Sequence, residues 1–442
     1  MIYSEERVHF TFEIFKRLER ELSSKCNTRF LYTHNFEKVI NPRYAKKVPI
    51  HRWYILKESY SPYLIEELVK AKVVRMPTKG VLDPFVGAGS TLLGSQWIGT
   101  PSIGVDIVPF FCLVSKVKTL WKSYNIKVLK EIYEKVRRLD VEKEPNLGFP
   151  TLSTFSRVYD ARILRELLVI KEFILDLNKD LELYKDLLKV VLASILEPTS
   201  RAKKNGKGLK IVRKGPLEKP KNAFLRKLEE VINDLSVVHY FLRPKYASAK
   251  VLNDDARQLG KVPKGETDLV VFSPPYLNTF DYTEVYKLEL WFLDFVKSRN
   301  EWYELRRKTF RSHNLAKWAR TEYWSHEVLN KIEDYLRKQE LWCEEIPIIV
   351  RGYFDDMYLT LKALYEVTYD ECCVVIIVGN SAYGGIIIPV DLLIMRSALE
   401  VGFIPEKLLI VRELGTSSQQ LRLLRRDMRK LLRESIIVLR KR

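Results

Sequence analysis

The chain has few of the residues that build disulfide frameworks and metal sites. Its 442 residues include five cysteines and six histidines, which form neither a Cys-x-x-Cys pair nor a His-Glu-x-x-His motif. We therefore expect no disulfide scaffold and no bound metal. No uninterrupted apolar stretch is long enough to span a bilayer, and Met1 to Arg7 lack the character of a signal peptide. The sequence predicts a cytoplasmic protein with no membrane association.

Glutamine is also scarce, with five residues, whereas charged residues make up 30% of the chain. This balance favours a thermophilic source. The length is sufficient for two or three domains that bury a large apolar core.

Positive charge is in excess and is concentrated in two runs. The formal net charge is +19; ten Lys or Arg and one Glu lie between Arg201 and Arg226, and nine Lys or Arg and two acids lie between Leu421 and Arg442. One such run alone is typical of a solvated surface, but two favour contact with a phosphate backbone. The candidate contacts are Arg201, Lys203, Lys204, Lys207, Lys210, Arg425, Arg426 and Arg429.

A tetrapeptide, Ser273-Pro274-Pro275-Tyr276, directly follows the apolar run Leu269–Phe272. The run predicts a buried strand, and two prolines end it because neither has a backbone N–H for the ladder. The loop then offers unpaired carbonyls, a serine hydroxyl and a tyrosine ring. Such groups suit a planar ligand with an amino group, although four residues of this kind are also common in plain turns.

A glycine turn lies about 190 residues upstream. An apolar strand ends at Asp83, Gly87 and Gly89 follow, and Asp106 ends the next apolar strand 19 residues after Gly87. This arrangement is typical of nucleotide-type cofactor sites, in which the second acid accepts hydrogen bonds from ribose hydroxyls. Leu92 replaces the third glycine of the dinucleotide motif, and Asp83 would repel a phosphate. A cationic cofactor such as S-adenosylmethionine fits better.

Together these motifs resemble the amino-methylating DNA methyltransferases, and the Ser-Pro-Pro-Tyr form is typical of the cytosine-N4 enzymes. Two further segments match in order: Lys57–Pro62 resembles the motif at the methionine end of the cofactor, and Asn253–Arg257 resembles the motif that reaches its adenine. The resemblance implies base binding and catalysis by Ser273, Pro274, Pro275 and Tyr276. It implies S-adenosylmethionine binding by Tyr60, Ser61, Asp83, Pro84, Phe85, Gly87, Gly89, Ser90, Thr91, Asp106, Ile107, Asp255 and Ala256.

The expected fold is α/β, a Rossmann-like class I methyltransferase with a seven-stranded mixed sheet and an inserted helical domain. Residues 1–50 are predicted to be a helical and basic segment, and residues 51–119 the cofactor-binding half. Residues 120–245, with helical periodicity throughout, are the predicted insertion and a possible DNA-binding region. Residues 246–442 are predicted to hold the base-binding loop, strands 3 to 7 and a basic connector.

Two more groups of residues are candidate contacts with DNA. Asn278, Asp281 and Tyr282 follow the tetrapeptide closely enough to touch the base. The basic stretch Arg306–His313 is a further candidate for the backbone. The glycine-bearing tip Thr199–Lys210 is predicted to be a flexible basic loop.

The resemblance implies methylation of a cytosine amine in a specific sequence of duplex DNA, with the base extruded from the helix. A cognate restriction endonuclease that acts separately and association with a prokaryotic nucleoid are further expectations, and no pattern indicates an oligomeric state. An adenine-N6 methylase stays open, because the first residue of the tetrapeptide is an imperfect guide to the base. Two further alternatives are a tRNA guanine-N2 methyltransferase, whose tetrapeptide usually begins with Asp, and a silent DNA-binding subunit.

Overall fold

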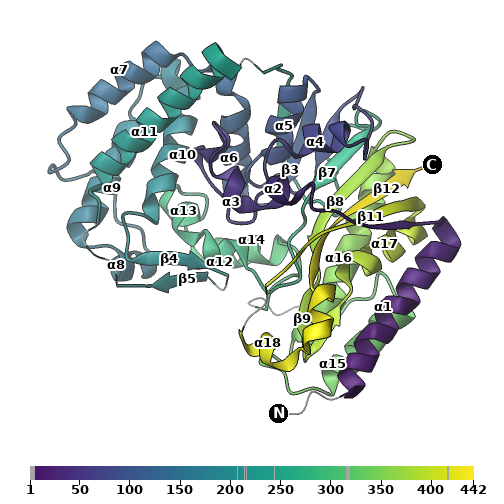
Figure 1. Cartoon of the computed structure of the whole chain (residues 1–442). Helices are drawn as coiled ribbons and strands as arrows, with labels where there is room; N and C mark the ends of the chain where they lie inside the picture. The colour runs from purple at the N-terminus through teal and green to yellow at the C-terminus, as the bar shows by residue number, and fades with distance from the viewer. Residues whose placement is uncertain are drawn as a thin grey trace.

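The computed structural model describes residues 5–442 except 207, 214, 216, 243, 315–318, 416 and 417. A twisted β-sheet with helices on both faces lies beside a mainly helical unit (Figure 1). In the described ranges, no helix has both the length and the apolarity needed to cross a membrane.

The main sheet has eight strands in the order β1-β11-β12-β8-β7-β2-β3-β6. Strands β6, β3, β2, β7 and β8 run parallel, and β12 is antiparallel to both β8 and β11. The predicted α/β mixed sheet is confirmed. It has one strand more than the seven expected, because β1 adds to the edge of β11 in parallel. The strands are β1 Arg29–Tyr32, β2 Val81–Asp83, β3 Ser102–Asp106, β4 Ala202–Asn205, β5 Gly208–Ile211, β6 Ala249–Asn253, β7 Leu269–Phe272, β8 Cys373–Gly379, β9 Ser381–Tyr383, β10 Ile386–Ile388, β11 Phe403–Glu413 and β12 Arg433–Lys441.

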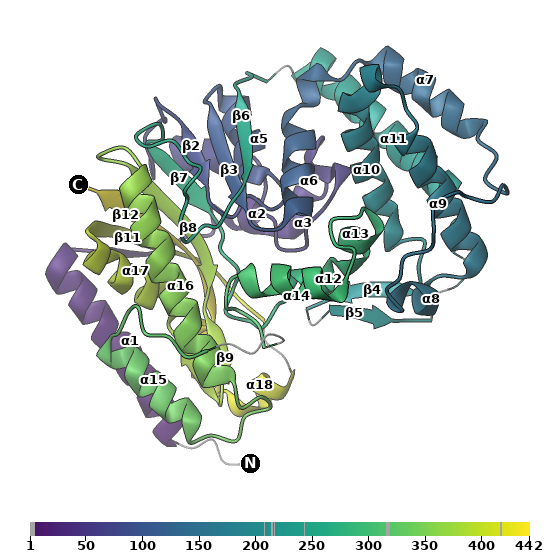
Figure 2. The same ribbon diagram turned by 180° about the vertical axis from the view of Figure 1, so that it is seen from behind.

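The helices differ widely in length, and the two longest, α1 and α16, both pack beside the C-terminal strands (Figures 1 and 2). The α-helices are α1 Glu5–Cys26, α2 Glu37–Ile40, α3 Pro42–Ala45, α4 Leu64–Lys70, α5 Ser90–Ile98, α6 Pro109–Thr119, α7 Ile126–Arg137, α8 Thr154–Val158, α9 Ala161–Leu175, α10 Glu182–Leu196, α11 Pro220–Ser236, α12 Tyr282–Val285, α13 Lys287–Phe292, α14 Arg299–Lys308, α15 Glu327–Arg337, α16 Ile346–Val367, α17 Val390–Val401 and α18 Ser418–Leu423.

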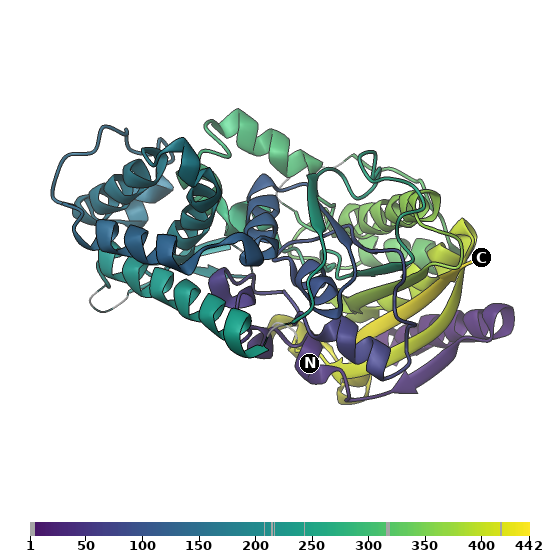
Figure 3. The same ribbon diagram turned by 90° about the horizontal axis from the view of Figure 1, so that it is seen from above.

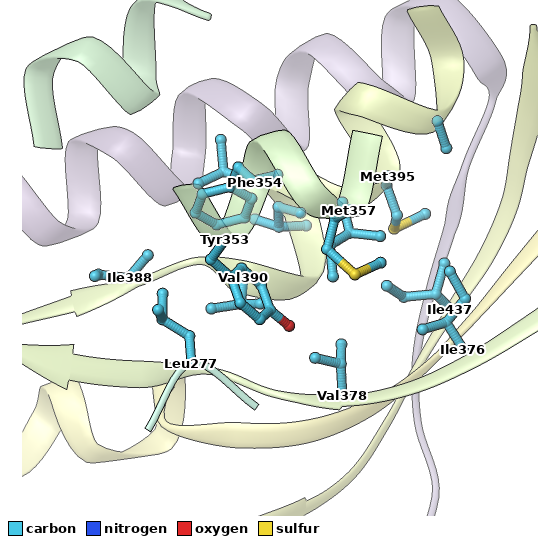
Figure 4. Close-up of a cluster of buried hydrophobic side chains, with 14 of the residues drawn as sticks. Leu277, Tyr353, Phe354, Met357, Ile376, Val378, Ile388, Val390, Met395 and Ile437 are labelled. Carbon is cyan, nitrogen blue, oxygen red and sulfur yellow. The ribbon is translucent and has the colours of Figure 1, made fainter. Parts of the chain in front are cut away.

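Strand β7 explains why the sheet is covered on both faces. All four of its residues are buried, as expected for a central parallel strand. Leu269 and Val271 face a core shared with α4, whereas Val270 and Phe272 face a core shared with α1, α15, α16 and α17. Figure 4 shows part of the second core, in which Leu277 lies close to side chains of α16 and α17. The residue after the tetrapeptide therefore anchors that loop in the core.

The predicted helical insertion contains α7 to α11, which pack together beside α6 and α13 (Figure 3). Helix α7 is amphipathic, with Leu129, Ile132 and Val136 buried. The expectation of a flexible loop at Thr199–Lys210 is wrong in part, because β4 and β5 form an antiparallel hairpin there. Two-residue alternation buries Ala202 and Lys204 and leaves Lys203 and Asn205 exposed.

Candidate active site

The carboxyl ends of β7, β2, β3 and β6 bring the sequence motifs to one edge of the sheet. These strands are parallel neighbours, so the residues that end them or follow them lie side by side. Asp83 ends β2, Asp106 ends β3, Asn253 ends β6, and Ser273 follows β7. Segments separated by up to 190 residues thus form one site.

The glycine turn is held by Asp106. One carboxylate oxygen accepts a hydrogen bond from the backbone N–H of Gly87 at 3.0 Å, and the other accepts from Val108 at 2.9 Å. Gly87 and Gly89 have φ angles of +44° and +78°, which favour glycine. At Gly89 a Cβ would also come within 3.2 Å of Ser115. Burial raises the pKa of Asp106 to about 6.

Asp83 is buried beneath the same turn. It accepts hydrogen bonds from the Phe85 N–H at 2.9 Å and from the Tyr60 hydroxyl at 3.3 Å. Burial raises its pKa to about 7, so a nearby cation would favour its charged form. The sequence motifs did not indicate Lys118, whose buried Nζ donates to the carbonyls of Tyr54 and Ala88 at 2.7 and 2.9 Å and whose pKa burial lowers well below its ordinary value. Lys118 thereby ties α6 to the turn.

A cavity of about 960 Å³ opens above this turn. Its carboxylates and its apolar side chains, among them Phe85 and Ile107, fit a cofactor that combines positive charge with a flat apolar ring. Of the predicted cofactor residues, Ser61, Gly89 and Thr91 do not line the cavity. Those that do are Tyr60, Asp83, Pro84, Phe85, Gly87, Ser90, Asp106, Ile107, Asp255 and Ala256. Among the described residues, no cluster of three or more His, Cys, Asp or Glu could hold a metal.

The stretch Arg306–His313 forms a wall of this cavity, which corrects the assignment of its two buried arginines as DNA contacts, whereas Arg307 and Lys308 are exposed. Arg306 is buried and pairs with Asp281 at 2.5 Å, and Arg311 is buried and pairs with Asp356 at 2.7 Å. Neither guanidinium is available to a phosphate. The residues of this stretch that line the cavity are Lys308, Thr309, Phe310, Ser312 and His313.

The residues after the tetrapeptide separate into three roles. Asp281 is buried and caps the start of α12 through Thr283 and Glu284, so its predicted contact with the base is wrong. Tyr282 lines the 960 Å³ cavity. Asn278 lines a second cavity.

This second cavity, of about 1410 Å³, lies on the other side of the tetrapeptide. Ser273 and Tyr276 line it, together with Trp342 and Arg412. Ser273 also lines the first cavity, as do Glu58 and Tyr60, so these three residues form the boundary between the two spaces. Of the two prolines, Pro275 lines the first cavity and Pro274 lines neither.

The predicted DNA-binding residues have different surroundings. Lys204 is buried between Tyr54 and Glu289, with which it forms an ion pair, so its assignment to DNA is wrong. Whether a side chain of a strand points inward or outward depends on its position in the two-residue alternation. The composition of the segment does not reveal that position. Lys203 and Lys210 are exposed on the hairpin. Arg201 pairs with Asp160 and Arg425 with Asp427; Arg426 and Arg429 are exposed, and Lys207 lies outside the described residues.

Known proteins resemble this chain over most of its length, although no protein-family model matches it. It is 28% identical over 438 residues to the Type II methyltransferase M.BsoBI of Geobacillus stearothermophilus, with 87% of this chain and 84% of that protein covered. It is 25% identical over 459 residues to the Type II methyltransferase M.AvaI of Anabaena variabilis, with 96% and 93% covered. The Type II methyltransferase M.MjaII of Methanocaldococcus jannaschii is 30% identical over 138 residues, which are 31% of this chain and 24% of that protein.

Proposed function

We propose that the chain is a Type II DNA methyltransferase, like the relatives that it resembles, and that it transfers a methyl group from S-adenosylmethionine to the exocyclic N4 amine of a flipped cytosine in a specific duplex sequence. One observation carries this proposal. Ser273 borders both the cavity of the cofactor motifs and the cavity that Tyr276 lines, so a group held at Ser273 has access to both.

The polarity of the 960 Å³ cavity supports S-adenosylmethionine as the cofactor. Asp83 and Asp106 end neighbouring strands and both line the cavity, where a sulfonium and an ammonium would gain from negative charge. Each carboxylate oxygen of Asp106 accepts one hydrogen bond from the turn. Each has a further lone pair that could accept a hydrogen bond from a ribose hydroxyl. When bound, the cofactor supplies an activated methyl group.

The tetrapeptide would prepare the amine. The lone pair of an exocyclic amine is delocalised into the ring, so the nitrogen must become pyramidal before it attacks. A hydrogen bond from the amine to the Ser273 hydroxyl oxygen would favour that shape. Positioning and local electrostatics then lower the barrier. Stacking on the Tyr276 ring would offset part of the few kcal/mol that base extrusion costs.

The DNA would lie over the second cavity and reach the exposed basic residues of both runs. Lys203 and Lys210 of the hairpin and Arg426 and Arg429 of the connector are the proposed phosphate contacts. The division of the chain at residues 50, 119 and 245, and a cognate restriction endonuclease that acts separately, remain predictions.

The test is to incubate the purified chain with methyl-labelled S-adenosylmethionine and either duplex DNA or tRNA, and then to digest the product to nucleosides. We expect label in N4-methylcytosine from DNA. Label in N6-methyladenine would show that the target base is adenine and not cytosine. Label in N2-methylguanine from tRNA would refute a DNA substrate, and binding of DNA without transfer would identify a silent subunit.

A further inference from the structure

Of the residues that the structure describes, Glu58 is the one acidic residue that borders both cavities, and although it lies within the Lys57–Pro62 motif it has no assigned role. With Tyr60 and Ser273 it makes up the whole of their shared boundary. A carboxylate in that place borders the same two spaces as Ser273, so it is accessible to an amine held there. We propose that Glu58 accepts the proton that the exocyclic amine releases during methyl transfer; this role rests on the proposed function.

The charge balance of the reaction requires such a step. As the amine nitrogen forms its bond to the methyl carbon, the C–S bond breaks and its electron pair returns to sulfur, which becomes a neutral thioether. The nitrogen becomes cationic with two hydrogens still attached. One of these protons passes to the Glu58 carboxylate and leaves a neutral methylated amine, and the protonated acid then exchanges with solvent.

The neighbouring lysines are held by other partners, so Glu58 is not neutralised by an ion pair. Lys57 donates its ammonium to the backbone carbonyl of Lys204, and the ammonium of Lys204 pairs with Glu289. Among the residues that the structure describes, no Lys or Arg lies within ion-pair distance of the Glu58 carboxylate. The carboxylate is therefore free to take a proton.

The Glu58 side chain is exposed to the two cavities, and the protein that encloses them raises its pKa to about 7, while the charge of Lys57 counteracts part of this effect. Other groups surround it: Lys204 on the hairpin, and the phenols of Tyr282 and Tyr286, whose own pKa values Glu58 helps to raise. Tyr60, Asp83, Asp106 and His313 line the same cavity. A proton acceptor with a pKa near neutrality is well matched to a cationic nitrogen and can still release its proton to water.

The test compares wild type, Glu58→Gln, Glu58→Asp and the control Glu67→Gln, a residue of α4 that pairs with Lys70 at the surface. Single-turnover methylation of duplex DNA is followed from pH 5.5 to 8.5 at saturating labelled S-adenosylmethionine, and cofactor affinity is measured by calorimetry. Saturation matters because Asp83, whose pKa is also about 7, would otherwise contribute its own pH dependence through cofactor binding.

We expect the wild-type rate to rise as Glu58 ionises near pH 7, and Glu67→Gln to behave identically. Glu58→Gln should be slower by about 100-fold at pH 8, without that rise, while its Kd for the cofactor stays within threefold. Glu58→Asp should recover part of the rate.

Two results would overturn this role: an unchanged rate in Glu58→Gln, or a weakened cofactor affinity with the rate at saturation and its pH profile intact. The second result would make Glu58 a partner of the cofactor's positive charge. Failure of the proposed function is seen separately in the wild type, as label on adenine or on no DNA nucleoside at all.

Discussion

The Tyr276 hydroxyl donates a hydrogen bond to Oε1 of Glu434, with 2.7 Å between the oxygens. Glu434 is buried on β12, and the guanidinium of Arg412 on β11 donates to its other oxygen. The proposed stacking ring is thus fixed at both ends: the backbone holds it in the tetrapeptide loop after β7, and the hydroxyl holds it to β12, two strands along the sheet. Its orientation does not depend on a bound base.

Tyr276→Phe removes the hydroxyl and retains the ring. A buried carboxylate then loses one of its two donors, so the free energy of unfolding should fall by about 1.5 to 3 kcal/mol. Urea denaturation measures this change, and Tyr44→Phe, at an exposed ring, is the control and should be neutral. Methyl transfer should survive in Tyr276→Phe and fall sharply in Tyr276→Ala. Equal activity in both variants would argue against a stacking role.

Gly379 lies directly against the same ring. A Cβ at this position would come within 3.1 Å of the Tyr276 ring and 2.5 Å of a Leu414 methyl. Gly379→Ala should therefore displace Tyr276 and reduce methyl transfer while the Kd for S-adenosylmethionine remains unchanged. Gly148→Ala is the matched control, because nothing lies within 4 Å of the added carbon. A fully active Gly379→Ala variant would show that the ring position is not critical.

Ser273→Ala tests the hydrogen bond to the amine. Loss of one aligned hydrogen-bonding group in an active site typically costs about 100-fold in rate, and we expect a decrease of that order. Calorimetry should give nearly wild-type cofactor affinity, because the other residues of the cofactor cavity are intact. If cofactor affinity falls in step with the rate, Ser273 contributes to the cofactor site instead.

Two adjacent lysines of the hairpin should respond in opposite ways. Lys204→Ala leaves the carboxylate of Glu289 buried without its cation, so stability should fall by about 3 to 5 kcal/mol. Lys203→Ala should leave stability unchanged but weaken DNA binding and lower the salt slope of log K by about 1. Thermal denaturation and binding titrations at several salt concentrations measure the two effects. An unchanged salt slope for Lys203→Ala would exclude it as a phosphate contact.

The pKa of Asp83, raised by burial to about 7, predicts opposite pH effects on stability and on cofactor binding. The folded protein keeps a proton that the unfolded chain releases near pH 4, so this group stabilises the fold at low pH. That contribution is lost as pH rises toward 7, by up to roughly 1.4 kcal/mol per pH unit. Affinity for a cationic cofactor should rise over the same range.

Asp83→Asn should remove the contribution of Asp83 to both trends, while the smaller contribution of Asp106, whose pKa is about 6, remains. The Tm of Asp83→Asn minus the Tm of wild type should be larger at pH 8 than at pH 5. The affinity of the variant for S-adenosylmethionine should be low at every pH. Parallel Tm curves for the two proteins would show that Asp83 does not titrate in this range.

Prediction from sequence succeeded where a residue is tied to a strand end. Asp83, Asp106 and Ser273 end or follow short apolar runs that predict buried strands, and parallel strands bring such residues together. It failed for charges whose direction depends on distant partners. The ion-pair partners of Lys204 and Arg311 are Glu289 and Asp356, and nothing local indicates either pair.

Two other features had no sequence signal. Strand β1 is short and largely exposed, and its pairing with β11 rather than its composition defines it. Glu58 lies between the two cavities at the point where three segments meet. These segments are the loop before α4, the tetrapeptide and α12. Only the assembled structure reveals such a boundary.

The pairing of Arg29–Tyr32 with Lys407–Ile410 also bears on biosynthesis. Of the described strands, β1 leaves the ribosome first, while β11 and β12 leave last. Helix α1 likewise buries Phe15 and Leu18 in a core completed by C-terminal segments. Because contacts so distant along the chain form slowly, α1 and β1 wait with their apolar faces uncovered until β11 and β12 have been synthesised. Chaperone demand during synthesis should therefore concentrate on these two elements rather than on the catalytic loops.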